Sequence, residues 1–121
     1  MRIAVASLVF VTSLAAAQPS APDFQEGSTA LSETEMTAAV ADKVFLATPA
    51  KGAQWRLQYN ANGYFFVNVG AFSDNGKWSV KGSTVCTEGK QVRYFCNEFR
   101  VKDGGLFMKR ESGEVLKLEL K

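Results

Sequence analysis

Two cysteines and no histidine limit the chemistry that this chain can perform. Cys86 and Cys96 are the only thiols among 121 residues, and the sequence contains no histidine. Without histidine there is no Ser/His/Asp or Cys/His activation of a nucleophile, and the commonest ligand of zinc is missing. Two thiols alone do not complete a tetrahedral metal site. The sequence therefore predicts no metal, no cofactor and no nucleophilic catalysis.

Paired carboxylates are the remaining catalytic chemistry. A pair of acidic side chains can act as general acid and base in sugar hydrolysis, but only when the two face one cleft. Four of the five candidates fall at predicted turns, where carboxylates are normally solvated. Glu98 is the exception, and it faces outward if Phe95 and Phe99 face inward. The sequence therefore predicts a protein that is not an enzyme. The candidates are Glu88, Glu98, Asp103, Glu111 and Glu114.

Residues 1–17 have the composition of a signal peptide. Arg2 carries a positive charge, an apolar run extends from Ile3 to Leu14, and residues 15–17 are alanines. The run is shorter than the roughly twenty residues that cross a bilayer. We expect export to the periplasm or the medium, with no transmembrane segment. Removal of 17 of the 121 residues leaves 104, the size of one domain.

Export also determines how the two cysteines are interpreted. In an oxidising compartment a disulfide is the default state of two exported thiols. Cys86 and Cys96 lie symmetrically about residue 91, so a hairpin that turns through residues 89–91 places them opposite each other. We therefore predict a cross-strand disulfide. Two free buried thiols or a redox-active pair are the alternatives, and the spacing differs from the Cys-x-x-Cys of redox sites.

The charges are unevenly distributed along the chain. Residues 18–42 carry five acidic side chains and no basic ones, whereas residues 43–121 carry 13 basic against 7 acidic side chains. A basic body can attract an acidic surface. The Lys and Arg residues are nevertheless scattered singly, and an exported protein seldom meets nucleic acid. We therefore exclude nucleic acid as a partner and interpret most of these charges as solvated surface.

A short helix is predicted near the start of the folded domain. Residues 18–30 hold two of the three prolines and little apolar material, which is typical of a flexible lead-in. Ser32 and Glu35 then form a capping box, with Leu31 and Met36 at the hydrophobic-staple positions. We expect a helix of about ten residues that packs by a narrow apolar stripe. The single domain therefore covers residues 31–121.

From Val44 onward the hydrophobic pattern alternates, and every predicted break contains a glycine. This pattern favours an antiparallel meander of at least six strands, forming a small barrel or a strongly curved sheet. The fold class is therefore mainly β with one N-terminal helix. The Asp74-Asn75-Gly76 sequence is predicted to be a turn, and the apolar run 64–72 a strand that is covered on both faces. The expected strand segments are 44–47, 55–59, 64–72, 78–80, 84–87, 92–101, 106–110 and 115–120.

The aromatic residues are the remaining candidates for a functional site. A small barrel needs bulky inward side chains, so most of them are expected to fill the core. Four tyrosines and tryptophans are also suited to a barrel mouth or an exposed face, because each joins an apolar body to one polar tip. Such a site would recognise a glycan, a small apolar molecule or a protein loop. These candidate binding residues are Trp55, Tyr59, Tyr64 and Trp78.

Two neighbouring segments of the chain resemble those of a protein family. They are Gly76-Lys-Trp78-Ser-Val80-Lys-Gly82-Ser-Thr-Val-Cys86 and the following Arg93-Tyr-Phe-Cys96. The members of this family are small exported proteins of Gram-negative bacteria known only as a domain of unknown function. They share a Trp-bearing strand, a tight glycine turn and two paired cysteine strands, and they open with a similar helix. The likeness covers residues 31–121. It implies a two-cysteine β-barrel in the envelope and no active residue.

A weaker resemblance is to periplasmic inhibitors of C-type lysozyme. These are small disulfide-bearing β-barrels whose loop Ser and Lys enter the acidic cleft of the enzyme. The nearest counterpart in this sequence is Ser73-Asp-Asn-Gly-Lys77, which makes Ser73 and Lys77 a candidate inhibitory loop. The segment departs from the family in spacing, and Asp74 would oppose an acidic target.

Taken together, the residues predict a non-enzymatic, exported binding or envelope-accessory protein. Its partner is open among an envelope protein, a glycan and a small apolar ligand. A periplasmic inhibitor of a lysozyme-type hydrolase and a purely structural envelope protein are the alternatives. A binding protein should present a concave aromatic patch or a protruding basic loop, whereas a structural protein should have a filled core and a featureless polar exterior.

Overall fold

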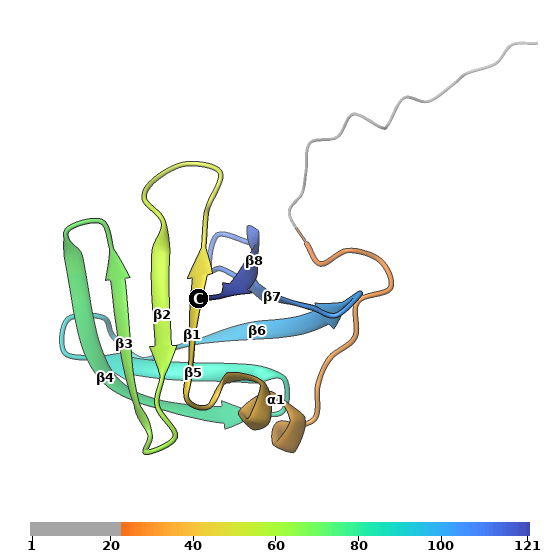
Figure 1. Cartoon of the computed structure of the whole chain (residues 1–121), viewed down its shortest axis with the longest axis horizontal. Helices are drawn as coiled ribbons and strands as arrows, with labels where there is room; N and C mark the ends of the chain where they lie inside the picture. The colour runs from red at the N-terminus through yellow and green to blue at the C-terminus, as the bar shows by residue number, and fades with distance from the viewer. Residues whose placement is uncertain (1–22) are drawn as a thin grey trace, which may run out of the picture.

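Eight antiparallel strands form a closed barrel, and one helix lies at one of its ends (Figure 1). The computed structural model describes residues 23–121, so the predicted signal peptide lies outside the described residues. Each strand pairs with the next along the chain, and β8 returns to pair with β1. The mainly β prediction is confirmed. The elements are α1 (Glu33–Val40), β1 (Lys43–Ala47), β2 (Trp55–Tyr59), β3 (Tyr64–Val69), β4 (Phe72–Lys81), β5 (Thr84–Gly89), β6 (Phe95–Lys102), β7 (Gly105–Lys109) and β8 (Val115–Leu120).

The predicted capping box starts α1. Ser32 Oγ accepts a hydrogen bond from the Glu35 N–H at 3.1 Å, and Glu35 Oε1 accepts one from the Ser32 N–H at 2.9 Å. The helix has eight residues, a little shorter than expected. Its apolar stripe is Met36 and Val40, both with no exposed surface. Because α1 contacts β1, β4 and β5, it covers one end of the barrel.

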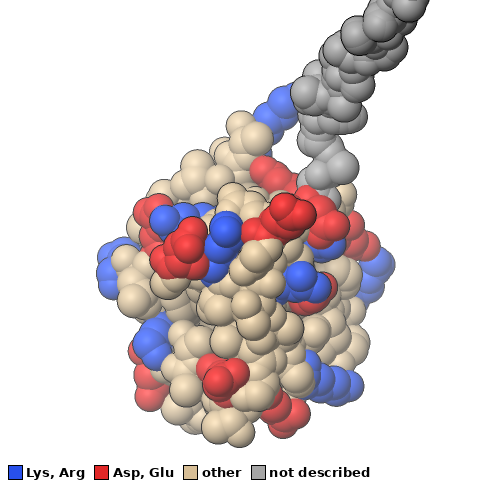
Figure 2. Space-filling model, turned by 90° about the vertical axis from the view of Figure 1, so that its right-hand side faces the viewer, with Lys and Arg blue, Asp and Glu red and all other residues tan. Residues whose placement is uncertain are grey.

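The segment before α1 lies along the barrel from Asp23 onward. Thr29 and Val101 exchange two backbone hydrogen bonds, each 2.9 Å long. Asp23 pairs with Lys109 at 2.8 Å, and Lys109 Nζ lies 5.2 Å from the centre of the Phe24 ring. The acidic segment before α1 is thus in direct contact with the basic part of the chain, residues 43–121. Figure 2 shows acidic and basic side chains interspersed on this face, with no field of one sign.

The predicted cross-strand disulfide is present. Cys86 of β5 and Cys96 of β6 face each other in register, with their Cα atoms 3.9 Å apart, and their sulfurs are bonded. The bond closes the chain segment that runs from β5 through the following loop to β6. This segment is one side of the barrel end opposite α1.

The predicted turn at Asp74-Asn75-Gly76 is wrong. These residues lie inside β4, which continues without a break from Phe72 to Lys81. The chain reverses instead at Gly70, whose φ of 62° suits the first residue of a two-residue hairpin turn. Gly76 serves a different purpose, because a Cβ there would overlap the carbonyl oxygen of Glu88 on β5. Figure 1 shows β4 bending from the direction of β3 to that of β5.

The prediction that residues 64–72 form a strand covered on both faces is also wrong. The side chains of β3 alternate, with Phe65 buried and its neighbours Tyr64 and Phe66 exposed by 47% and 39%. An antiparallel barrel has an outer face that meets solvent, so apolar residues in every position must leave some of them exposed. This outward aromatic pair is a surface feature rather than core.

The core lies toward the α1 end of the barrel. Phe99 is fully buried there, and the ring of Tyr59 packs against Phe45 and Trp78 at centroid distances of 6.5 and 5.6 Å. Alternation along each strand sends every second side chain inward. The buried cluster consists of Met36, Val40, Phe45, Ala47, Leu57, Tyr59, Phe65, Val85, Phe99, Met108, Leu116 and Leu118.

Candidate ligand-binding site

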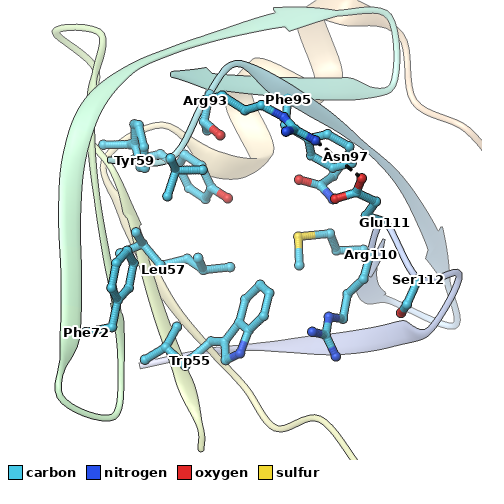
Figure 3. A pocket seen from close by; sticks show the side chains of 16 residues that line it. Trp55, Leu57, Tyr59, Phe72, Arg93, Phe95, Asn97, Arg110, Glu111 and Ser112 are labelled. Carbon is cyan, nitrogen blue, oxygen red and sulfur yellow. Dashed lines mark ion pairs between the residues drawn. The ribbon is translucent and has the colours of Figure 1, made fainter. Parts of the chain in front are cut away.

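The barrel interior is hollow at the end away from α1. A cavity of about 510 Å³ opens there, with walls made by side chains from β2 to β7 and by the adjoining loops (Figure 3). Most of its lining atoms are apolar. The lining residues are Trp55, Leu57, Tyr59, Phe65, Val67, Val69, Phe72, Thr87, Val92, Arg93, Phe95, Asn97, Met108, Arg110, Glu111 and Ser112.

Strand β2 spans the depth of the cavity. Its sequence alternates, so Trp55, Leu57 and Tyr59 all point inward, as Figure 3 shows. Trp55 is half-buried near the mouth, whereas Leu57 and Tyr59 are 6% and 3% exposed. Tyr59 also belongs to the core cluster, which forms the floor of the cavity. A ligand would therefore meet an indole ring first and a phenol ring last.

An arginine holds one side of the mouth in place. The Arg110 guanidinium lies 4.8 Å from the centre of the Trp55 ring and pairs with Glu114 at 2.6 Å. Glu114 Oε2 also accepts a hydrogen bond from the Ala50 N–H at 2.9 Å. This bond, together with the one from Arg110, lowers the pKa of the Glu114 carboxyl. The β7–β8 turn and the β1–β2 loop are thereby joined.

The opposite side of the mouth is a loop held by Asp74. This side chain is 5% exposed, and its carboxylate accepts hydrogen bonds from the N–H groups of Lys90, Gln91 and Val92 at 3.1, 3.0 and 2.8 Å. A fourth bond, 2.9 Å long, comes from the Asn75 N–H. Burial raises the pKa of Asp74, but the four bonds outweigh it and hold the pKa below its usual range.

Glycine makes room for this carboxylate. A Cβ at Gly89, on the neighbouring strand β5, would overlap the Asp74 carboxylate itself. The loop that Asp74 holds places Val92 and Arg93 at the cavity. Arg93 then reaches toward Glu111 of the β7–β8 turn, with 3.9 Å between their charged atoms, as the dashed line in Figure 3 marks. Because both side chains are largely exposed, this pair is weak.

Polar atoms also face the inner part of the cavity. Figure 3 shows the Tyr59 hydroxyl pointing into the space, and Asn97 and Thr87 line the same space from β6 and β5. The Asn97 side-chain N–H donates to the Lys109 carbonyl at 3.0 Å. Burial raises the pKa of Tyr59 far above its usual range, so this hydroxyl stays protonated.

The structure brings together two of the four predicted binding residues. Trp55 and Tyr59 line the cavity, whereas Tyr64 lies on the outer face beside Lys77 of β4. Trp78 packs beneath the floor against Tyr59, where its Nε1 donates to the Asn60 carbonyl at 2.8 Å. The four residues therefore do not share one surface, and the role of Trp55 and Tyr59 in binding stays a prediction.

The cavity residues on the other strands are not among those predicted from the sequence. Arg110, Asn97 and Met108 line the cavity, yet only the pairing of strands around the barrel brings them opposite β2. Alternation relative to the inward Phe99 places Asn97 inward and would have identified it. No local signal marks Arg110.

The segment 73–77, predicted as a candidate inhibitory loop, is part of a strand. Ser73 and Lys77 both lie within β4, where Ser73 pairs with Asn68 and Lys77 with Tyr64. Their side chains share the outer face of the sheet because an even number of residues separates them. Neither residue is carried on a protruding hairpin, because the predicted turn between them is part of a strand.

Across residues 23–121, no group of three or more His, Cys, Asp and Glu side chains is placed to hold a metal ion. None of the helices in this range is both long enough and apolar enough to span a bilayer.

Comparison of the chain with protein-family models, curated proteins and solved structures finds no match. Both family resemblances therefore stay predictions.

Proposed function

We propose that this is an exported, non-enzymatic binding protein whose barrel holds a small, largely apolar ligand. The observation that carries the proposal is the unfilled mouth half of the barrel. An eight-stranded barrel is wide enough for its side chains to fill it or for one small ligand to occupy it. The cavity of about 510 Å³ lies within the size range of small-molecule sites.

The walls of the cavity suit an apolar ligand. Leu57, Val67 and Met108 present aliphatic or thioether surface, and Trp55 and Phe72 add aromatic surface near the mouth. Transfer of apolar ligand surface from water to such walls contributes roughly 25 cal/mol for each Å² buried. Phe72 is 41% exposed, so a ligand would also cover apolar surface that now meets solvent.

The mouth is held open by bonds within the protein. Asp74 fixes the β5–β6 loop, Glu114 joins two loops on the other side, and the disulfide closes the base of the β5–β6 segment. A site that is ordered before binding loses less conformational entropy when the ligand arrives. This arrangement supports a binding role better than a structural one, for which a filled barrel is the expectation.

The compartment belongs to the same proposal. A formed disulfide is typical of exported proteins, and it agrees with the signal peptide predicted over residues 1–17. The periplasm and the medium both meet this condition. The lysozyme-inhibitor alternative has no support from the geometry, because Ser73 and Lys77 lie on the outer face of β4.

A neutral fluorescent probe tests the proposal. Phenylnaphthylamine carries no charge and fluoresces strongly only in apolar surroundings, and we expect the mature protein to bind it saturably. In Val67→Trp an indole replaces an inward isopropyl group and fills space that the probe needs. We expect this substitution to weaken binding by about tenfold or more, a loss of at least about 1.4 kcal/mol.

Phe66→Trp is the matched control. Residue 66 precedes residue 67 on the same strand but points outward, so the added indole does not enter the barrel. We expect wild-type affinity for this variant, with both variants keeping the far-ultraviolet spectrum of the wild type. Absence of saturable binding to the wild type, or equal losses in the two variants, would contradict a site inside the barrel.

A further inference from the structure

The deepest polar group of the cavity has no partner in the protein. Tyr59 is 3% exposed, and no described residue forms a hydrogen bond with its hydroxyl. Buried tyrosine hydroxyls ordinarily find a partner, because an unmade bond costs the desolvation of the group. Among the described residues, the only fully enclosed side-chain oxygen or nitrogen without a partner is Ser28 Oγ. The Tyr59 hydroxyl is therefore open to the cavity rather than sealed in the core.

The surroundings of this hydroxyl are polar but uncharged. Asn97 uses its N–H₂ group on the Lys109 carbonyl, and no described residue donates to its Oδ1. Thr87 also lines the cavity without a side-chain hydrogen bond to the described residues. Thr87 pairs with Trp78, whose ring lies against Tyr59, so these groups belong to neighbouring parts of the floor. The floor thus offers donors and acceptors in an otherwise apolar site.

Charged lining residues lie only at the mouth. Arg93, Arg110 and Glu111 come from the loop before β6 and from the β7–β8 turn, and Arg110 is already engaged by Glu114. Asp74, although buried, is not among the lining residues and has four N–H donors of its own. A charged ligand group at the floor would lose its hydration without gaining a counter-charge.

From these observations, and resting on the proposed function, we infer the chemical class of the ligand. It carries an uncharged oxygen group, a carbonyl or a hydroxyl, at the end that enters first, and this group bonds the Tyr59 hydroxyl at the floor. Its apolar body then fills the space between Leu57 and Trp55. The polar end of the ligand points inward, which is the reverse of an amphiphile that leaves its head group in water.

Two probes of the same shape separate this inference from the proposed function. Methyl naphthyl ketone has a carbonyl where isopropenylnaphthalene has a methylene, and the two are otherwise alike. We expect the wild type to bind both probes, because each presents the same naphthalene body to the apolar walls. In Tyr59→Phe the affinity for the ketone should fall by about three- to tenfold, the value of one hydrogen bond, while the affinity for the hydrocarbon is unchanged or higher. Naphthoate, which is anionic, should bind more weakly than the ketone.

Tyr64→Phe is the matched control, because it removes the same hydroxyl from the outer face. This variant should bind both probes as the wild type does. The carbonyl stretch of the bound ketone gives an independent measurement: its infrared frequency should lie below the value in hydrocarbon solvent for the wild type, and at that value for Tyr59→Phe. This shift is read from the occupied complex, so a loss of stability in the variant does not affect it.

The outcomes are distinct. If Tyr59→Phe does not lower the affinity for the ketone and the carbonyl frequency does not shift in the wild type, the inference about the floor is wrong and the apolar site stands. If neither probe binds, the proposed function fails and the inference falls with it. Equal losses of both probes in Tyr59→Phe would indicate that the substitution disturbs packing rather than one hydrogen bond, and would contradict the inference.

Discussion

The two ends of the barrel are closed in different ways. At one end, α1 inserts Met36 and Val40, which have no exposed surface, and β6 adds the fully buried Phe99 to the same core cluster. At the other end Phe72 stays 41% exposed, and no helix covers the opening in the described chain. The mouth loops are held by hydrogen bonds and ion pairs instead of by apolar packing. The helix end is therefore covered by fully buried apolar side chains, whereas the mouth keeps open, largely apolar space.

The largest difference between the ends should appear in the free energy of unfolding. Met36→Ala removes fully buried side-chain atoms from the helix end and should cost about 2–5 kcal/mol. Phe72→Ala removes a larger side chain at the mouth, where space is already present, and should cost less than Met36→Ala. Urea unfolding of the two variants measures both values. A larger loss for Phe72→Ala would reverse our assignment of the core.

The disulfide is expected to have the next largest effect. Removal of the Cys86–Cys96 bond by paired serine substitutions should lower the free energy of unfolding by roughly 3 kcal/mol on the chain-entropy model. Because the bond closes the segment that contains the β5–β6 loop, we also expect weaker probe binding at the mouth. Denaturant unfolding and a probe titration on the same sample test both effects. An unchanged unfolding midpoint would show that the bond does not restrain the unfolded chain.

Asp74 should produce a smaller and more local effect. In Asp74→Asn the side chain presents one oxygen where the carboxylate presented two acceptors, so it cannot keep all four bonds. The amides of Lys90, Gln91 and Val92 should then exchange with solvent faster, while those of α1 keep their rates. Amide hydrogen exchange followed by nuclear magnetic resonance measures this directly. Uniform acceleration in both regions would mean that the carboxylate supports the whole fold.

The same carboxylate predicts a pH dependence of the mouth. Its pKa is lower in the folded protein than in the unfolded chain, so its stabilisation is complete above the unfolded pKa. The stabilisation is lost as the pH falls through the folded pKa. Exchange at Gln91 and Val92 should therefore rise in acid before exchange in α1 does, after correction for the intrinsic rate. Asp74→Asn should remove this acid-dependent difference.

Local signals predicted the parts of the molecule that depend on neighbouring residues. Ser32 and Glu35 lie three residues apart, and the two cysteines face each other across a short hairpin, so short-range chemistry is sufficient to predict both. The two inward aromatic residues of β2 follow from alternation within one strand. These features are set by chain geometry that does not require knowledge of the whole barrel.

Residues used for long-range contacts were harder to predict. Asp74 and Gly76 have turn chemistry, but the structure uses one as a buried acceptor for a distant loop and the other for close approach to β5. The true turn at Gly70 lies between Val69 and Ala71, so no polar turn residue marks it in the sequence. Arg110 and Asn97 reach the cavity only because β6 and β7 lie opposite β2, and that placement depends on closure of the barrel.

The most direct test of the difference between the ends is a nuclear magnetic resonance titration with phenylnaphthylamine. Our account predicts saturable shifts at Trp55, Val67 and Met108, which line the cavity, and little change at Val40 under the helix. Outward Phe66 serves as the reference on the sheet surface. Shifts confined to the outer face or to the helix end, with the cavity residues unmoved, would contradict the claim that the open end of the barrel is the binding site.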